Sequence, residues 1–328
     1  MRNAGDVVLS ARRLVTTFDT PSGRLRAVDG LDLHLRLGEV VCLVGESGSG
    51  KSVTGLSLMG LIDPPGHVTC DEFWFDGHDL TTLPESEMER LRGRRIAMIF
   101  QEPLSALNPS RRVGDQIAEV LRIHGLASRA EATRRAVELL GRVGIDDAQL
   151  RARSYPHQLS GGQRQRVTIA IACIGSPRLI IADEPTTALD VTVQTQILDL
   201  LTEMQTSLGS ALLFITHDLG IVAELADRVV VLYAGQVVEE AAVEDLYRTP
   251  GHPYTVGLLA SVPDVDAPRK RGVALAAIPG TVPNLLEVGT GCRFRERCDR
   301  AHDRCGAEPP MITLSEGHRV RCWLYAGR

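Results

Sequence analysis

One run of this 328-residue sequence has the residue types and spacing needed to hold phosphate groups. It reads GESGSGKS and fits the pattern G-x-x-x-x-G-K-[ST]. In such a loop the glycines let successive backbone N–H groups turn inward, the lysine neutralises phosphate charge, and the final hydroxyl binds Mg²⁺. The candidate phosphate-binding residues are Gly45, Ser47, Gly48, Ser49, Gly50, Lys51 and Ser52.

A flexible Gly-Ser turn that happens to precede a lysine is the alternative explanation of this run. Lysine usage argues against it, because Lys51 and Lys270 are the only lysines among 36 basic residues. A compact ammonium fits inside a phosphate loop where a planar guanidinium does not. The run also lies between an apolar stretch at 40–44 and a helical pattern at 53–61, as a phosphate loop requires.

Two other strand-like runs end in polar side chains. The apolar run at 179–182 leads into Asp183 and Glu184, where the first carboxylate would hold Mg²⁺ and the second would activate a water. Taken alone, these carboxylates are explained equally well as a polar strand exit. The run at 211–216 leads to His217 in the same way, although a lone histidine is more often a structural hydrogen-bonding residue.

A further run, LSGGQ at 159–163, precedes a long helical pattern. Ser160 and Gln163 have the S-x-x-Q spacing of a capping box, so an ordinary helix start explains the serine. It does not explain Gly161 and Gly162, which cost backbone entropy in a first turn. We predict that an anion approaches this helix N-terminus closely.

The elements that position these motifs follow the pattern of an α/β fold. Short apolar runs that end in Gly or Asp alternate with helical stretches, which indicates parallel strands joined by helices. Residues 103–176 interrupt this alternation with helical patterns at 113–124, 128–142 and 160–174, which indicates a helical insert. The pattern weakens after residue 254, so we predict one domain over 1–260 and a small C-terminal domain over 261–328.

Composition and charge narrow the function classes. With 44% hydrophobic and 23% charged residues, the chain is expected to bury a core rather than remain disordered. The formal charge of -5 provides no general positive field, so we expect no nucleic-acid partner. The apolar runs are far shorter than the ~20 residues of a spanning helix, and the first residues lack the apolar stretch of a signal peptide. We therefore expect a cytoplasmic protein.

Together these motifs resemble the ATP-binding subunits of ABC transporters. The phosphate loop, Gln101, LSGGQ, the Asp183–Glu184 pair, Asp190 and His217 occur in the order and spacing of that family. The resemblance implies an ABC-type P-loop NTPase core with a helical subdomain insert and a small Cys-rich C-terminal extension. It also implies a head-to-tail dimer that holds each ATP between the phosphate loop of one subunit and the LSGGQ run of the other.

The resemblance assigns roles to individual residues. Ser52, Gln101 and Asp183 would bind Mg²⁺. Gln101 would also sense the membrane partner, and it counts with Glu184 and His217 among the catalytic residues. Glu184 would be the catalytic base, and His217 would hold the γ-phosphate and the attacking water. Phe18 would stack on adenine, and Asp190 would signal across the dimer. The LSGGQ residues would bind the nucleotide of the opposite subunit; they are Ser160, Gly161, Gly162 and Gln163.

Flanking runs narrow the resemblance to the oligopeptide and dipeptide importers. These runs are EPLSALNP at 102–109, YPH at 155–157, HPYT at 252–255, IPG at 278–280 and GCRF at 291–294. The resemblance implies a second, different ATPase, two membrane permeases and an extracytoplasmic substrate-binding protein, with this chain peripheral at the cytoplasmic face. The region from 101 to 124 would receive the permeases' coupling helices. Importers of nickel, glutathione and saccharides share this layout, so these substrates stay open.

Four of the seven cysteines crowd into the last 37 residues: Cys292, Cys298, Cys305 and Cys322. Disulfides are disfavoured in the cytoplasm, so the alternatives are a 4Fe–4S cluster, a zinc ion or four unligated thiols. Arginines near them would offset the negative charge of a cluster held by four thiolates; they are Arg293, Arg295, Arg297, Arg300 and Arg304. Similarity to peptide-importer ATPases with such a tail favours the cluster. His302 and His318 are further candidate ligands that we expect to be solvated.

A soluble ABC ATPase is the alternative function class. Its surviving form is a regulatory ATPase whose cysteine tail senses redox state. Against it stand the single nucleotide domain, the acidic charge balance and the importer-like tail.

Overall fold

The computed structural model describes residues 7–187, 189–262 and 278–327. The chain divides into two compact units, each of which is built from separate stretches of sequence. The first unit contains the described residues up to Ser10, together with His34–Glu39 and Phe73–Phe214. The second unit contains Ala11–Leu33, Val40–Glu72 and the described residues from Ile215 onward. The division falls inside the strands β1 (Val7–Thr20), β2 (Gly23–Arg36), β5 (Glu72–Phe75) and β9 (Ala211–Thr216). Each of these strands is described with the unit that holds most of it.

The first unit combines three neighbouring strands of a sheet with a group of helices. Strands β7 (Ile96–Ile99) and β8 (Leu179–Asp183) lie beside β9 in the order β9-β8-β7. Strand β7 runs parallel to β8, with Ile99 paired to Ala182. The elements of this unit are β5 Glu72–Phe75, β6 His78–Asp79, α2 Glu85–Leu91, β7 Ile96–Ile99, α3 Pro103–Ala106, α4 Val113–Ile123, α5 Arg129–Arg142, α6 Ala148–Arg151, α7 Gly161–Cys173, β8 Leu179–Asp183, α8 Val191–Leu208 and β9 Ala211–Thr216.

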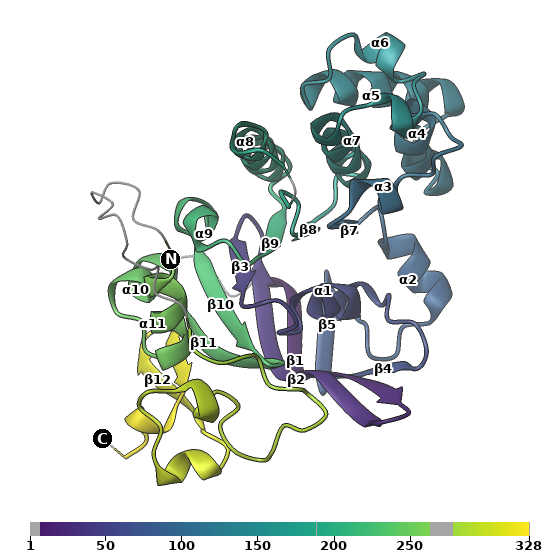
Figure 1. Cartoon of the computed structure of the whole chain (residues 1–328). Helices are drawn as coiled ribbons and strands as arrows, with labels where there is room; N and C mark the ends of the chain where they lie inside the picture. Colours follow the sequence, from purple (N-terminus) through teal and green to yellow (C-terminus); the bar gives the residue numbers. More distant parts are fainter. Residues whose placement is uncertain (1–6, 188, 263–277, 328) are drawn as a thin grey trace, which may run out of the picture. The chain divides into compact units, whose positions relative to one another are not determined.

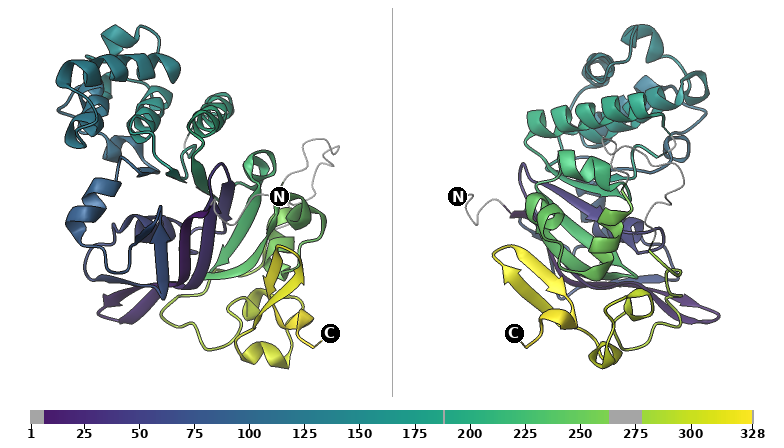
Figure 2. Two further views of the ribbon diagram at one scale, coloured as in Figure 1. Left: turned by 180° about the vertical axis from the view of Figure 1, so that it is seen from behind. Right: turned by 60° about the vertical axis from the view of Figure 1, so that its left-hand side comes forward.

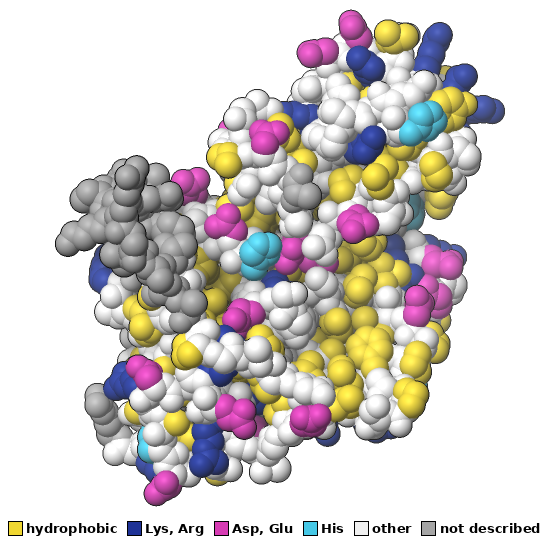
Figure 3. Space-filling view, viewed as in Figure 1, with side chains coloured by type: hydrophobic (Ala, Val, Ile, Leu, Met, Phe, Trp, Pro, Cys, Tyr) yellow, Lys and Arg dark blue, Asp and Glu magenta, His cyan; other side chains and the backbone are white. Residues whose placement is uncertain are grey.

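Helices α4, α5 and α7 pack against one another in the first unit (Figure 1). Helix α5 shows why: its buried side chains are small or aliphatic and lie on one face. They are Ala132, Ala136, Leu139 and Leu140. The opposite face carries charged residues, such as Arg134 paired with Glu131 and Glu138, and charged side chains gather where α5 and α6 lie in Figure 3.

The second unit contains the strands around the phosphate loop and the whole described C-terminal segment. Its strand order is β12-β13-β11-β10-β3, with β10 parallel to β3 and antiparallel to β11. Strand β1 pairs with β2 and, antiparallel, with β4. The elements are β1 Val7–Thr20, β2 Gly23–Arg36, β3 Val40–Val44, α1 Lys51–Met59, β4 Gly66–Thr69, α9 Leu219–Leu225, β10 Arg228–Tyr233, β11 Gln236–Ala242, α10 Val243–Arg248, α11 Pro253–Ala260, β12 Met311–Ser315 and β13 His318–Arg321.

Buried polar contacts attach the C-terminal hairpin, made of β12 and β13, to strand β11. Glu239 is fully buried, and its carboxylate contacts the imidazole Nε2 of His318 at 2.8 Å. Glu240 pairs with both Arg228 and Arg319. Removing one partner of such a pair would leave a buried charge uncompensated, so these contacts fix the hairpin in place. In both views of Figure 2 the hairpin (yellow) lies beside the turns of residues 291–306.

The structure confirms the predicted helical patterns and corrects one residue. Helices α4, α5 and α7 match the predicted ranges to within a residue or two, and 100–178 contains no strand. His302 is exposed, as expected, but the expectation of a solvated His318 is wrong, because it is only 3% exposed beside Glu239. Within the described part of the chain, no helix combines the length and apolar character needed to cross a bilayer.

Candidate functional site: a nucleotide site and a cysteine module

The phosphate loop follows strand β3 and leads directly into helix α1 in the second unit. Gly50 is the N-terminal cap of α1, so the first N–H groups of the helix face the loop. The Lys51 ammonium donates to the backbone carbonyl oxygens of Gly45, at 2.8 Å, and of Glu46, at 3.0 Å. The loop is therefore closed around the lysine that would neutralise phosphate charge.

The glycines of this loop are required by its backbone. Gly45 has φ +154° and Gly50 has φ +102°. A Cβ atom at Gly45 would lie 2.1 Å from the carbonyl oxygen of Leu232, and one at Gly50 would lie 2.3 Å from that of Ala27. No other residue fits at either position without moving the backbone.

The first unit brings Gln101 and Glu184 together. Ile99 pairs with Ala182 across the parallel strands, so the residues two positions further on emerge side by side at the carboxyl edge. The Gln101 amide donates to the Glu184 carboxylate at 3.0 Å, and the Thr187 hydroxyl donates to the same oxygen at 3.0 Å. Glu184 has φ +44°, a strained conformation for a glutamate and one that is common at functional sites.

Asp183 and Ser52 supply the kinds of oxygen that Mg²⁺ prefers. Asp183 ends strand β8 and is 5% exposed, whereas Ser52 is half-buried in the first turn of α1. The donor set therefore fits a magnesium ion in character. The two residues belong to different units, and the assignment of Ser52, Gln101 and Asp183 as ligands stays a prediction.

The LSGGQ run starts helix α7 with the predicted capping box. The Ser160 hydroxyl accepts from the Gln163 N–H, and the Gln163 side chain accepts from the Ser160 N–H. Its two glycines differ in their surroundings. A Cβ at Gly162 would lie 2.8 Å from a Val193 methyl group, so packing against α8 already explains this glycine. A Cβ at Gly161 would meet nothing closer than 3.9 Å, so packing does not explain it.

The remaining predicted nucleotide contacts lie at element ends or on a strand. Asp190 caps α8 by accepting from the Val193 N–H. His217 is exposed directly after β9, and Phe18 is half-buried on β1 opposite Gly66. These positions put each side chain at a surface, and their roles toward a nucleotide stay predictions.

The four C-terminal cysteines are free thiols that lie near one another in the second unit. Burial first, and then the charges of Cys305, Cys322 and Cys298, raise the pKa of Cys292 to about 11. No group of three or more His, Cys, Asp or Glu side chains is arranged to hold a metal in the described ranges. The thiols are therefore neighbours without forming a closed ligand cage.

Backbone N–H groups point at three of these sulfurs. The N–H groups of Phe294, Arg300 and Leu324 hydrogen-bond to cysteines two residues earlier in the chain. The acceptors are Cys292, Cys298 and Cys322. Hydrogen bonds of this kind favour the thiolate form, but burial outweighs them and raises the pKa of all three thiols.

Three of the five nearby arginines have partners other than the cysteines. Arg293 pairs with Asp29, and Arg297 pairs with Glu46 of the phosphate loop. Arg304 stacks over the Trp323 ring at 4.5 Å. Arg293 and Arg297 are therefore already paired with carboxylates. Arg304 contacts an aromatic ring, and Arg295 and Arg300 are exposed. That these arginines offset the charge of a cluster stays a prediction.

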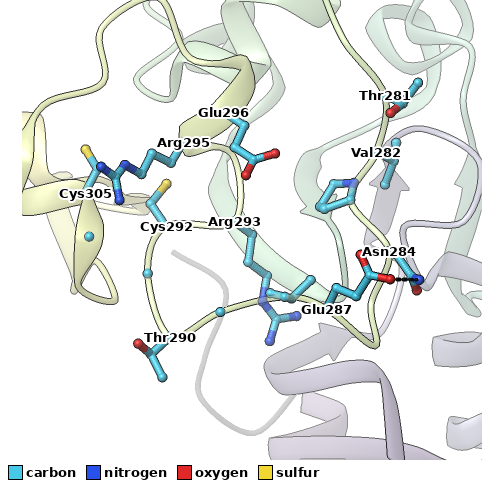
Figure 4. Close-up of a pocket in the computed structure, with 15 residues that line it drawn as sticks. Thr281, Val282, Asn284, Glu287, Thr290, Cys292, Arg293, Arg295, Glu296 and Cys305 are labelled. Atoms are coloured by element: carbon cyan, nitrogen blue, oxygen red, sulfur yellow. Dashed lines mark hydrogen bonds between the residues drawn. The ribbon is translucent and has the colours of Figure 1, made fainter. Parts of the chain in front are cut away.

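A cavity of about 560 Å³ opens beside the cysteine module, by which we mean the segment that carries the four C-terminal cysteines. Cys292 and Cys305 line one side of it together with Arg295, and Glu287 and Asn284 line another (Figure 4). The walls are mainly polar backbone and side chains from 281–296 and 305–306. Small solutes can therefore reach two of the four thiols.

Sequence reasoning missed the contacts that tie the C-terminal segment to the phosphate loop. The Tyr254 hydroxyl accepts from the Glu46 N–H at 2.8 Å, and the Glu46 carboxylate accepts from Arg297. The sequence contained only two hints of this contact: Arg297 stands directly before Cys298, and Glu46 stands inside the glycine-rich run. Neither feature points to the other without the fold.

Comparison with known proteins first defines the class of protein. The ABC transporter family model matches residues 28–187. A dimeric ATP-binding cassette in a post-hydrolysis state, with ADP and Pi bound, is 29% identical with a TM-score of 0.64, and covers 72% of this chain and 98% of its own. A component of the cbiONQ ABC transporter complex of Clostridium perfringens has a TM-score of 0.62 at 27% identity, covering 74% of this chain and 92% of its own. The predicted ABC-type α/β fold is confirmed.

Full-length relatives narrow the class. A putative peptide import ATP-binding protein of Brucella ovis is 50% identical and spans 96% of both chains. The oligopeptide transport ATP-binding protein AppD of Bacillus subtilis is 48% identical over 97% of both chains, and OppD of Escherichia coli is 45% identical over 97% of this chain and 93% of its own. The model for the C-terminal region of oligopeptide and dipeptide transporters matches residues 238–305. The chain belongs to the ATP-binding subunits of the oligopeptide and dipeptide ABC transporters.

Proposed function

We propose that this chain hydrolyses ATP to power the import of dipeptides or oligopeptides. The observation that carries the proposal is full-length similarity, at 45–50% identity, to ATP-binding proteins of peptide importers, including the C-terminal region that marks this group. In the proposed assembly the chain forms a head-to-tail ATPase dimer with a non-identical partner. The assembly also contains two permeases and an extracytoplasmic substrate-binding protein. This chain is peripheral at the cytoplasmic face of the membrane.

Residues of both units have the chemistry that ATP hydrolysis requires. Glu184 acts as general base on the attacking water, and the Gln101 and Thr187 donors hold its carboxylate in position. The phosphate loop with Lys51 holds the β- and γ-phosphates, and His217 and Asp190 contribute from the ends of β9 and the start of α8. Bound Mg²⁺ supplies charge neutralisation on the phosphate oxygens.

The stretch that would receive the permeases exposes apolar side chains. Leu104 is 59% exposed and Ile123 is 72% exposed, and Phe100 lies beside the start of the same region. Exposed apolar side chains on a surface that the family uses for docking are consistent with burial under a partner's helix.

We further propose a 4Fe–4S cluster on Cys292, Cys298, Cys305 and Cys322. Its support is the proximity of the four thiols and the three N–H···S hydrogen bonds. Anaerobic purification should give brown protein with iron and sulfide in matching amounts. Colourless protein with stoichiometric zinc would show instead that the zinc alternative is right.

The transport proposal is tested on the complex extracted gently from membranes. We expect mass spectrometry to find two permeases, a second ATPase and a peptide-binding protein, and we expect peptide plus binding protein to stimulate ATP hydrolysis. Glu184→Gln should lower that rate at least about a hundredfold, because general-base catalysis contributes 10²–10⁴. Glu203→Gln, on the exposed face of α8, is the matched control. Stimulation by nickel, glutathione or saccharide in place of peptide would overturn the substrate assignment.

A further inference from the structure

Arg297 makes a two-point ion pair with Glu46, a residue of the phosphate loop. Its guanidinium donates to the two carboxylate oxygens of Glu46 at 2.6 and 3.0 Å. The Arg297 side chain is 4% exposed and that of Glu46 is 30% exposed. A bidentate, largely desolvated pair of this kind is geometrically specific and stronger than a surface ion pair.

The surroundings hold Arg297 in one orientation. Its Nε donates to the carbonyl oxygen of Pro279 at 2.8 Å, and the guanidinium carbon lies 5.7 Å from the Tyr233 ring centroid and 5.8 Å from that of Phe294. Tyr233 and Phe294 also contact the Tyr254 ring. The arginine is therefore fixed by an aromatic cluster before it reaches Glu46.

Glu46 is held at its backbone as well as at its carboxylate. Its N–H donates to the Tyr254 hydroxyl, and its carbonyl oxygen accepts from the Lys51 ammonium. The residue lies between Gly45 and Ser47, where the loop would surround the phosphates of ATP. An uncompensated carboxylate at this point would repel a triphosphate, and would disturb the loop backbone if it moved.

We propose that Arg297 is a positioning residue for ATP binding, which neutralises the Glu46 carboxylate and holds it in one place beside the phosphate loop. The ATP site of this chain is then complete only when the C-terminal segment is docked. This inference rests on the proposed ATPase function and adds a residue, 251 positions away in sequence, that the phosphate-loop pattern does not contain. A purely structural role, in which the pair only anchors the C-terminal segment, makes different kinetic predictions.

The test uses the purified complex and measures KM for ATP and kcat together. Arg297→Gln should raise KM about tenfold while kcat at saturating ATP stays within about twofold, because repulsion weakens binding rather than the chemical step. Arg297→Lys should give an intermediate KM, since an ammonium replaces the two-point contact with a single one. Arg248→Gln changes an exposed arginine at the end of α10 in the same unit and should leave KM at the wild-type value.

The double variant Glu46→Gln with Arg297→Gln separates the two roles. If repulsion is the cause, removing the carboxylate should return KM to within about threefold of wild type. A structural anchor would predict that the double variant is at least as impaired as Arg297→Gln alone. A fall in kcat with unchanged KM would also overturn the proposal. A wild-type complex without ATPase activity would instead contradict the proposed function itself.

Discussion

The glycines of the phosphate loop before helix α1 and those in the first turn of helix α7 face different surroundings. At the phosphate loop, positive φ angles and backbone oxygens at 2.1 and 2.3 Å leave space for glycine alone. At the LSGGQ turn, Gly161 has no positive φ, and an added Cβ would meet only a Leu189 methyl group at 3.9 Å, an ordinary contact. The first turn is shaped completely by its own chain, whereas the second leaves a surface at which something else can approach. The difference matches a dimer in which the second turn meets a nucleotide held by the other subunit.

Gly50→Ala should give the largest effect within this comparison. The added Cβ would lie 2.3 Å from the Ala27 carbonyl oxygen at a residue with φ +102°, so we expect a loss of at least about 2 kcal/mol in unfolding free energy and loss of ATP binding. Denaturant unfolding and nucleotide titration measure these two quantities. Gly38→Ala, with φ +71° and nothing within 4 Å, isolates the backbone cost, which should be about 1 kcal/mol. Equal losses for the two variants would contradict the steric argument.

Gly161→Ala should separate stability from activity. Alanine is a better helix former and meets no close atom here, so the melting temperature should stay at or above that of wild type while ATPase activity of the complex falls about tenfold or more. Gly162→Ala should also lose stability, by about 1 kcal/mol, because its Cβ meets Val193. Adding Val193→Ala should restore the stability of that variant but not its activity. Full ATPase activity in Gly161→Ala would show that nothing approaches the open turn.

The stability of the folded chain should also depend on pH, through the helix that supports the phosphate loop. Burial lowers the pKa of His252 to about 3, and this residue caps the helix whose Tyr254 holds the loop. Between pH 6.5 and 3 the unfolded chain therefore binds the extra proton, and stability falls as the pH falls through that range. At pH 5.5 the loss should be about 1 kcal/mol relative to pH 7.5.

His252→Asn tests this dependence, because asparagine can still cap the helix but does not titrate. Thermal unfolding of the variant and the wild type at the two pH values gives the comparison. The acid-induced loss should be smaller in the variant by about 1 kcal/mol. An identical loss in both proteins would assign it to other groups.

The sequence permits prediction of features that depend on local spacing. The phosphate loop, the capping box at Ser160 and the helices of residues 113–173 all follow patterns that repeat within a few residues, so the structure confirms them. The strand end carrying Glu184 was also predicted, since it follows an apolar run, whereas Gln101 was assigned only through the family resemblance. Local patterns determine local structure, and residues that follow parallel strands lie together at the carboxyl edge of the sheet.

Pairings between distant side chains were not predictable in this way. His318 looked solvated because its own surroundings in sequence are polar, yet its partner Glu239 lies 79 residues earlier. Arg297 lies next to a cysteine in the sequence, yet its partner is Glu46 of the phosphate loop. The sequence around a charged residue does not indicate which opposite charge it will pair with. Only the fold determines whether its partner is a sequence neighbour or a residue of a distant loop.

The distance in sequence between Glu46 and Arg297 also bears on how the protein is made. A ribosome that adds roughly 10 residues per second needs a few tens of seconds to pass from one to the other. During that interval the emerging chain has its glycine-rich loop but not the arginine that balances the loop's carboxylate. Truncated or unfinished chains would therefore compete poorly for cellular ATP, which favours occupation of the transporter by subunits that have been synthesised to the end.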